Sequence, residues 1–218
     1  MRAIVLSILT FFFFINISHA ESDISSEFSW YSKGLSEEKS ASSMNNKLEL
    51  LGEKITEKES IDLTEKVNNH YNKALTFYLK GADVGSAISA WKAVGLGSSG
   101  MAGQLSDEKI KTLILQAAKG NVIDAQMSFV LDNCNAQYTE CKDSKAAVFW
   151  LKKATKNGSG VAANILGFLY EHGRLVNKNM DASISCYKFA SEKGNDEAQN
   201  NMNRLLKNKN YPSNNECE

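Results

Sequence analysis

Four cysteines are the side chains with the clearest capacity for chemistry in this sequence: Cys134, Cys141, Cys186 and Cys217. An even number of cysteines in an exported chain is typical of disulfides, which persist in oxidising compartments. Among the three connectivities that four cysteines allow, we favour the two local pairs, Cys134–Cys141 and Cys186–Cys217, and free buried thiols are the alternative. A metal site is disfavoured because the spacings are not paired C-x-x-C and no histidine recurs beside them.

A glycine-rich run is a second candidate for chemistry. Gly95, Gly97 and Gly100 form a literal G-x-G-x-x-G. A dinucleotide-binding loop must follow a strand and open a helix, whereas residues 87–94 have a helical pattern. We therefore interpret the run as a closely packed or flexible turn between helices.

The histidines and serines offer no catalytic constellation. His70 and His172 have no second histidine or carboxylate at ligand spacing, and we expect His172 to be exposed. No G-x-S-x-G elbow supplies an activated serine, and the cysteines are assigned to disulfides. The sequence predicts no catalytic, cofactor-binding or metal-binding residue, no cofactor, and no enzymatic activity.

The first 20 residues have the pattern of a secretory signal peptide. Arg2 supplies a basic start, residues 4–17 are almost wholly apolar, and small residues surround a cleavage point after Ala20. The apolar run is shorter than the roughly 20 residues that usually cross a bilayer. We therefore predict cleavage of residues 1–20, export, and no stable membrane anchor afterwards.

Charge and proline content narrow the remaining classes. The chain has 25 basic and 25 acidic side chains without a basic block, so the electrostatic footprint of a nucleic-acid partner is missing. Its one proline, Pro212, and the lack of strand alternation predict an all-helical fold.

Three further segments follow the signal peptide. Residues 21–60 are polar, and we predict a leader that is partly disordered or forms one short helix. Residues 61–208 are predicted to form a helical domain, opened by a capping box from Asp62 to Glu65, and residues 209–218 a C-terminal tail. We expect helices at about 62–80, 84–95, 106–119, 123–134, 143–157, 160–172, 180–193 and 195–208.

The helical domain repeats itself with a step of 36 residues, which separates Ala154 from Ala190 and Gly158 from Gly194. Such a period is typical of stacked helical units. We expect Gly120, Gly158 and Gly194 to close helices in the left-handed conformation, and alanines to lie where helices cross closely. Four large side chains at helical spacing are predicted to be core: Trp150, Leu166, Tyr187 and Met202.

This pattern resembles the Sel-one-like repeat family, relatives of the tetratricopeptide repeats. The most specific stretch is residues 162–173, AANILGFLYEHG, which has the family's A…LG..Y..G run, and residues 181–190 follow as its second helix. The resemblance extends over roughly 106–206 and implies an α/α solenoid of antiparallel helix pairs. Residues 74–105 fit as a degenerate unit that caps the stack.

The repeat departs from the family pattern at its first two cysteines. Aligning Ala125 with Ala162 places Cys134 at the position of Glu171, where the tyrosine and glycine of the usual turn are absent. We hypothesise that a Cys134–Cys141 disulfide pins this turn, with a stabilisation of about 2–3 kcal/mol at most. The helix must then end near Cys134, because continuous helix would hold the two cysteines too far apart.

The resemblance implies a protein-binding role. Repeat stacks present an extended concave groove, and we expect a protein or peptide partner there. The predicted function is a secreted or periplasmic scaffold of the bacterial envelope, used as an adaptor or as an inhibitor or immunity-type binder. The alternatives are a regulator of cell-envelope enzymes and, least favoured, an enzyme.

Overall fold

The computed structural model describes residues 2–207 and 217, with side chains from Ser25 onward except Glu53. This part of the chain contains nine α-helices and one short 3-10 helix, and no strand. The predicted all-α class is confirmed. The predicted tail, 209–218, lies outside the described residues apart from Cys217.

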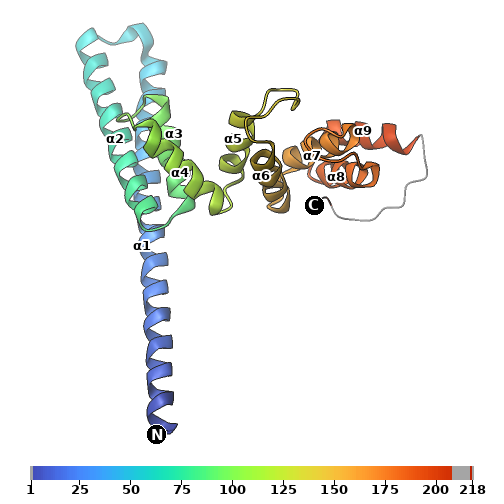
Figure 1. Ribbon diagram of the computed structural model, residues 1–218. Helices are drawn as coiled ribbons and strands as arrows, with labels where there is room; N and C mark the ends of the chain where they lie inside the picture. Colours follow the sequence, from blue (N-terminus) through green and yellow to red (C-terminus); the bar gives the residue numbers. More distant parts are fainter. Residues whose placement is uncertain (1, 208–216, 218) are drawn as a thin grey trace. The chain divides into compact units, whose positions relative to one another are not determined.

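The chain divides into two compact units, Met1–Gly120 and Asn121–Glu218. The first unit is made of α1 (Arg2–Leu51), the 3-10 helix (Gly52–Lys54), α2 (Glu57–Asp83), α3 (Ala87–Ser99) and α4 (Asp107–Lys119). Within it, α2 packs against both α1 and α3, and α3 packs against α4. Figure 1 shows α1 and α2 side by side as an antiparallel pair.

The second unit is made of α5 (Ile123–Asn133), α6 (Ser144–Lys156), α7 (Gly160–His172), α8 (Met180–Glu192) and α9 (Asp196–Leu206). Each of these helices packs against the next, and α7 also contacts α9. Six helices of the two units begin at a polar side chain that accepts a hydrogen bond from a backbone N–H three residues on: Ser86, Ser106, Asp143, Ser159, Asn179 and Asn195. These caps satisfy N–H groups that the helix leaves unpaired, so they fix the helix starts close to their predicted positions.

The segment predicted as a leader, residues 21–60, has a different structure. Its described part continues α1 to Leu51 and packs along α2. The Trp30 ring stacks on Phe77 with 6.0 Å between ring centroids, and Ala41 is fully buried. The prediction of a loose leader is therefore wrong here, because contacts with α2 stabilise a helix that composition alone disfavours.

The predicted capping box is also misplaced. Helix α2 begins at Glu57, and its N-cap is Thr56, whose hydroxyl oxygen accepts from the Glu59 N–H at 3.3 Å. The Glu59 carboxylate in turn accepts a hydrogen bond from the Thr56 N–H at 2.9 Å. Asp62 lies inside the helix and contacts Lys66 at 2.6 Å. Two T/D-x-x-E signals occur close together, and the earlier one caps the helix.

One of the three glycine caps does not have the predicted conformation. Gly158 and Gly194 have φ values of 97° and 83°, as predicted, but Gly120 has a φ of −83°. The left-handed residue there is Asn121, with φ of 69°. Glycine is required at 120 for another reason: an added Cβ would lie 2.2 Å from the Cβ of Ala87. The glycine thus permits α4 to end close to the start of α3.

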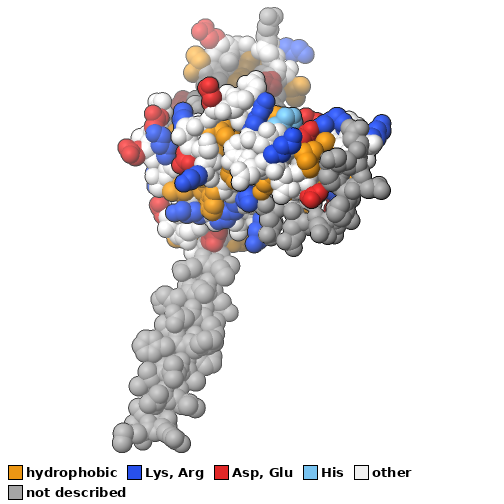
Figure 2. All heavy atoms as spheres, turned by 45° about the vertical axis from the view of Figure 1, so that its right-hand side comes forward, with side chains coloured by type: hydrophobic (Ala, Val, Ile, Leu, Met, Phe, Trp, Pro, Cys, Tyr) orange, Lys and Arg blue, Asp and Glu red, His pale blue; other side chains and the backbone are white. Residues whose placement is uncertain are grey.

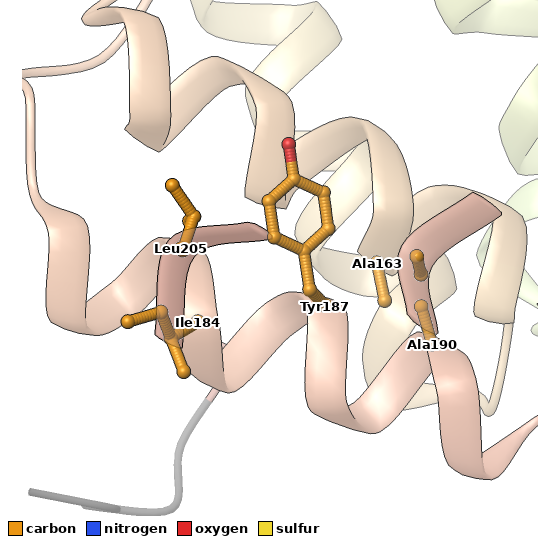
Figure 3. Close-up of a cluster of buried hydrophobic side chains, with 6 residues drawn as sticks. Ala163, Ile184, Tyr187, Ala190 and Leu205 are labelled. Carbon is orange, nitrogen blue, oxygen red and sulfur yellow. The ribbon is translucent and has the colours of Figure 1, made fainter. Parts of the chain in front are cut away.

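Small residues line the crossings in the second unit, as predicted. Five alanines are fully buried: Ala154, Ala162, Ala163, Ala190 and Ala198. Trp150, Leu166 and Tyr187 are buried, and Met202 packs against the last cluster. Figure 3 shows Tyr187 rising from α8 among Ala163, Ile184 and Leu205 with its hydroxyl directed away from that helix.

Each unit contains one arrangement that we call a clasp. In the Glu171 clasp, the Tyr187 ring packs on Gly167, and a Cβ added there would lie 2.7 Å from the ring. The Tyr187 hydroxyl donates to Glu171 at 2.9 Å, and Arg204 from α9 pairs with the same carboxylate at 2.7 Å. Three consecutive helices, α7, α8 and α9, are thereby joined through one buried carboxylate.

The Glu38 clasp repeats this arrangement in the first unit. The Tyr78 ring packs on Gly34, four residues before Glu38, just as Gly167 stands four residues before Glu171. The Tyr78 hydroxyl donates to Glu38, and Lys92 of α3 pairs with it at 3.0 Å. The pair α1–α2 therefore has the internal contacts of a repeat unit, although its sequence lacks the family's turn.

Candidate binding pocket in the C-terminal unit

The segment 134–141 forms a short hairpin after α5, which we call the disulfide hairpin. Helix α5 ends at Asn133 with Cys134 as its C-cap, so the predicted end near Cys134 is confirmed. Cys134 and Cys141 form an isolated antiparallel bridge, and their sulfur atoms lie 2.01 Å apart, which is disulfide bonding distance. The Asn135 N–H donates to the Glu140 carbonyl at 3.0 Å. These contacts give the hairpin a defined shape.

The sulfur atoms of Cys186 and Cys217 lie 1.93 Å apart, which is also bonding distance. Both pairings are the local ones that we favour from the sequence. Cys217 packs against the cluster around Tyr187, so this pair brings a residue from beyond α9 onto the core of the second unit.

A pocket of about 310 Å³ opens beside the disulfide hairpin, and we call it the Arg174 pocket. Its walls come from the hairpin, from α7 with the turn that follows it, and from α9. The lining residues are Ala136, Gln137, Tyr138, Asn164, Ile165, Phe168, Arg174, Glu197 and Asn201. Asn164 and Phe168 of α7 lie on one face of their helix, and Glu197 and Asn201 of α9 lie on one face of theirs, because positions four apart share a helix face.

Arg174 is held in place at the mouth of the turn after α7. Gly173 ends the helix with φ of 65°, and the Arg174 N–H donates a hydrogen bond to the Leu169 carbonyl at 3.0 Å. The guanidinium carbon stands 4.9 Å from the centroid of the Phe168 ring. Its Nη1 donates to the Gln137 carbonyl at 2.9 Å. The guanidinium is thus positioned by one stacking contact and one hydrogen bond to the hairpin.

The α9 side of the pocket has the opposite charge. Asn164 donates from Nδ2 to the Glu197 carboxylate at 3.2 Å, and its buried Oδ1 accepts no hydrogen bond. Neither Arg174 nor Glu197 forms an ion pair with another described residue. Burial raises the pKa of the Tyr138 hydroxyl, so it stays protonated near neutral pH. The pocket lining therefore combines apolar side chains, Ile165 and Phe168, with a cation and a carboxylate.

The Glu171 clasp holds the α9 wall against α7. Burial raises the pKa of the Glu171 carboxyl, but hydrogen bonds from Arg204 and Tyr187 and the Arg204 charge outweigh it, and the net pKa is lowered. Burial and then the bond to Glu171 raise the pKa of Tyr187. The hydrogen bond from Arg204 to Glu171 raises the pKa of Arg204. The clasp is therefore ionised and fully paired at neutral pH.

Residues 142–159 and 160–195 match the Sel1 repeat family model. These residues of the chain therefore contain Sel1 repeats, as the sequence resemblance predicted. Helix α7 and Arg174, which line the Arg174 pocket, lie within the second matched segment, 160–195.

Similar proteins include one curated protein and solved structures of Sel1 repeat proteins. DAP3-binding cell death enhancer 1 from Rattus norvegicus is 32% identical over 108 residues, which are 48% of this chain and 20% of the relative. The chain thus spans about a fifth of that relative's length. A Sel1 repeat protein from Oxalobacter formigenes is 25% identical with a TM-score of 0.50, covering 62% of this chain and 55% of its own.

A third likeness concerns the fold alone. A protective antigen of uropathogenic Escherichia coli with an SLR fold is 16% identical, with a TM-score of 0.53, and the match covers 71% of this chain and 38% of the antigen. Together with the Oxalobacter formigenes structure, it confirms the predicted all-α repeat solenoid.

The remaining sequence candidates do not form a second site. The interpretation of the glycine run as a turn between helices is wrong for Gly95 and Gly97, which lie inside α3; Gly100 caps the helix with φ of 73°, and the run follows no strand. Gly97 allows close packing, because a Cβ there would meet Leu105 at 2.5 Å. In the part of the chain with described side chains, no three histidine, cysteine or acidic residues are grouped as for a metal ion.

The two histidines have different surroundings. His172 is exposed, as predicted, and its ring centroid lies 4.4 Å from that of Phe168. His70 has a carboxylate partner that spacing along the chain does not indicate: its Nδ1 lies 2.5 Å from Glu37, across the α1–α2 pair.

The sequence alone does not identify the residues of the Arg174 pocket. Arg174 stands in the turn after α7, and no motif among its neighbours marks it as a binding residue. Its meaning depends on Gln137 of the hairpin and Phe168 of α7, which only the fold brings together.

Proposed function

We propose that this chain is a non-enzymatic repeat scaffold that binds a protein partner through an extended segment held in the Arg174 pocket. The pocket itself is the observation that carries the proposal. Ile165 and Phe168 give it an apolar floor, and amide and charged groups border that floor on both sides. Mostly apolar concave sites with a few placed polar groups are typical binding sites.

Polar contacts must contribute to binding specificity here. On the face shown in Figure 2, apolar side chains form small separate patches among basic and acidic ones. Isolated apolar residues on a surface are ordinary, whereas a broad patch marks a large hydrophobic interface. This supports a partner segment of limited length with matching polar groups. We favour a single dedicated partner, which this chain binds either as an adaptor or as an inhibitor or immunity-type protein.

The proposed setting is the periplasm or the extracellular space. The signal-peptide pattern of residues 1–20 and two cysteine pairs at bonding distance support it. Among the described residues, no helix is both long and apolar enough to cross a membrane. Cleavage after Ala20 leaves the α1 contacts intact, since the ones described above begin at Trp30.

Amino-terminal sequencing of the protein from fractionated cells tests this setting. We expect a chain in the exported fraction that begins at Glu21. A chain that keeps its first residues and remains in the cytoplasm would contradict the proposed export, while leaving the proposed binding role to its own test.

Site-specific photo-crosslinking tests the binding role. A photoreactive residue placed at Ile165 lies on the pocket floor, and one placed at exposed Lys152 on α6 is the matched control. We expect a discrete adduct from position 165 that is missing from position 152. The captured protein, once purified, should form a stoichiometric complex that Phe168→Ala weakens and Lys152→Gln leaves unchanged.

Two results would contradict the binding role. One is equal crosslinking from both positions, and the other is a complex insensitive to Phe168→Ala. If the partner is a cell-envelope enzyme whose turnover changes on binding, the alternative of an enzyme regulator replaces that of an adaptor.

A further inference from the structure

We propose that the Arg174 pocket selects partner segments that carry an acidic side chain, with the aspartate or glutamate carboxylate bound by the Arg174 guanidinium. This inference rests on the proposed function and adds the chemical class of the segment. It is based on the position of the Arg174 guanidinium, which lines the pocket and forms no ion pair with Glu197, the carboxylate of the same pocket.

Arg174 retains most of its hydrogen-bonding capacity. A guanidinium has five N–H donors in one plane, and the bond from Nη1 to the Gln137 carbonyl uses one of them. The guanidinium carbon lies 4.9 Å from the centroid of the Phe168 ring, and Arg174 lines the pocket, so its remaining donors are available to a ligand there. A planar fork of this kind matches a carboxylate in a bidentate geometry.

The positive charge of Arg174 is not paired with a carboxylate of any described residue. Among the described residues of the second unit, the ion pair is that of Arg204 with Glu171, whereas Arg174 donates to the Gln137 carbonyl and lies over the Phe168 ring. The side chain is already ordered by that bond and by the Phe168 ring. Less conformational freedom is therefore lost when a ligand binds, which favours affinity.

The pocket also sets the direction of the segment. Glu197 stands on the α9 side, where its charge disfavours a second acidic residue and favours a basic one or an N–H donor. Asn164 of α7 donates to Glu197, and Ile165, the next residue of α7, also lines the pocket. We therefore expect an acidic residue near the hairpin, an apolar residue over Ile165, and a basic or uncharged residue toward α9.

A competing explanation is that Arg174 only ties the hairpin to α7. Two other contacts hold the hairpin together, however: the Cys134–Cys141 pair and the hydrogen bond from the Asn135 N–H to the Glu140 carbonyl. A purely structural arginine would change stability when replaced and would leave ligand preference untouched. The test must therefore measure preference.

Selection from a display library of random short peptides provides that measurement. The peptides are fused to their carrier at the C-terminus, so no free terminal carboxylate is present, and the bait is the purified exported chain with its disulfides intact. With the unsubstituted bait, we expect selected peptides to be enriched in aspartate or glutamate at one position. With Arg174→Gln the enrichment should vanish, and a selected acidic peptide should bind about tenfold more weakly, as expected for a lost hydrogen bond to a charged group.

Two further baits sharpen the result. Arg174→Glu should reverse the preference toward lysine and arginine, and Glu197→Gln should relax the basic preference at the other end while keeping the acidic one. Lys152→Gln removes one positive charge on α6 and should reproduce the unsubstituted selection. Circular dichroism of each bait checks that the helices are retained.

The two proposals fail in different ways. If no bait selects any peptide, the proposed binding role of the pocket fails. If peptides are selected without an acidic preference, or with the same preference by Arg174→Gln, the carboxylate assignment is overturned and the binding role stands. A second library with free C-termini is the comparison: selection from that library alone overturns the assignment to an acidic side chain, while the binding role stands.

Discussion

The Tyr187 hydroxyl donates a 2.9 Å hydrogen bond to the Glu171 carboxylate, from α8 to α7. The same carboxylate forms an ion pair with Arg204 of α9 at 2.7 Å. Glu171 is only 9% exposed, so its charge is stable there because both partners are present. A buried carboxylate thus joins three helices whose apolar contacts are made largely by alanine.

Replacing the carboxylate is expected to destabilise the second unit. Glu171→Gln should lower the free energy of unfolding by about 1–3 kcal/mol at neutral pH, because it weakens two hydrogen bonds and leaves Arg204 without its counter-ion. Denaturant unfolding followed by hydrogen exchange in α7–α9 measures the change. Glu192→Gln, at an exposed position on α8, is the control and should be near neutral.

The effect of Glu171→Gln depends on pH in a defined direction. The folded pKa of Glu171 lies below the ordinary value of 4.5, so the carboxylate stabilises the fold fully above that value. The stabilisation is lost as the pH falls through the lowered folded pKa. The difference between the two proteins should therefore be constant near neutrality and shrink below pH 4.5. A difference that grows on acidification would contradict this assignment.

Gly167 is expected to tolerate no side chain. The Cβ of Gly167→Ala would lie 2.7 Å from the Tyr187 ring, and relieving that overlap should cost about 1–3 kcal/mol of unfolding free energy. Gly95→Ala is the control, since Gly95 lies within α3 with nothing within 4 Å of an added Cβ. That change should stabilise by up to about 1 kcal/mol. Equal effects at the two positions would contradict the close packing of Tyr187.

The first unit permits a parallel test of α1. Gly34→Ala would bring a Cβ within 2.6 Å of the Tyr78 ring, so it should loosen the contact between α1 and α2. We expect faster hydrogen exchange in residues 25–51 and in α2, with Ser36→Ala on the exposed side of α1 as the control. Unprotected amides over residues 25–51 in the unsubstituted protein would instead restore the prediction of a loose leader.

The helix bounds after residue 105 were predictable because their signals are local. Ser106, Asp143, Ser159 and Asn195 each combine a polar cap with an apolar periodicity that follows it, and both are read from a few neighbouring residues. The helix expected at 84–95 is observed at Ala87–Ser99, because Ser86 caps its start and Gly95 and Gly97 do not end it. The repeat step strengthens the same signals, since one well-formed unit indicates where the next begins and ends.

Helix α1 and the pocket were not predictable for a common reason. The buried positions of α1 include Gly34 and Ala41, and its interior acid, Glu38, needs Tyr78 and Lys92 as partners. Such positions do not produce apolar periodicity, so composition indicates a polar segment. The pocket likewise combines side chains from separate segments, none of which has a functional pattern by itself.

The disulfide hairpin is expected to support the pocket. Replacing Cys134 and Cys141 by serine should cost at most about 2–3 kcal/mol of stability, and it should weaken binding of an acidic peptide, because the Gln137 carbonyl that positions Arg174 lies in the hairpin. Peptide binding with and without reductant measures this effect. Replacing the Cys186–Cys217 pair by serine should leave that affinity almost unchanged, since neither residue lines the pocket.

Peptide mapping under non-reducing conditions tests the pairs themselves. We expect fragments joined as Cys134 with Cys141 and as Cys186 with Cys217. Free thiols at these positions in exported protein, or crossed pairs, would contradict the proposed disulfides.

The position of Phe168 connects the clasp to the pocket. At the repeat step of 36 residues, Phe168 occupies in α7 the place that Arg204 occupies in α9, and Leu151 takes that of Tyr187. In the preceding repeat Cys134 stands at the position of Glu171, so that position supplies no carboxylate to pair with a cation, and Arg174 lies over the Phe168 ring. Divergence between duplicated units is thus enough to create a recognition site. A position that pairs with the buried carboxylate in one repeat does not do so in the other, so its side chain can change there without altering the backbone.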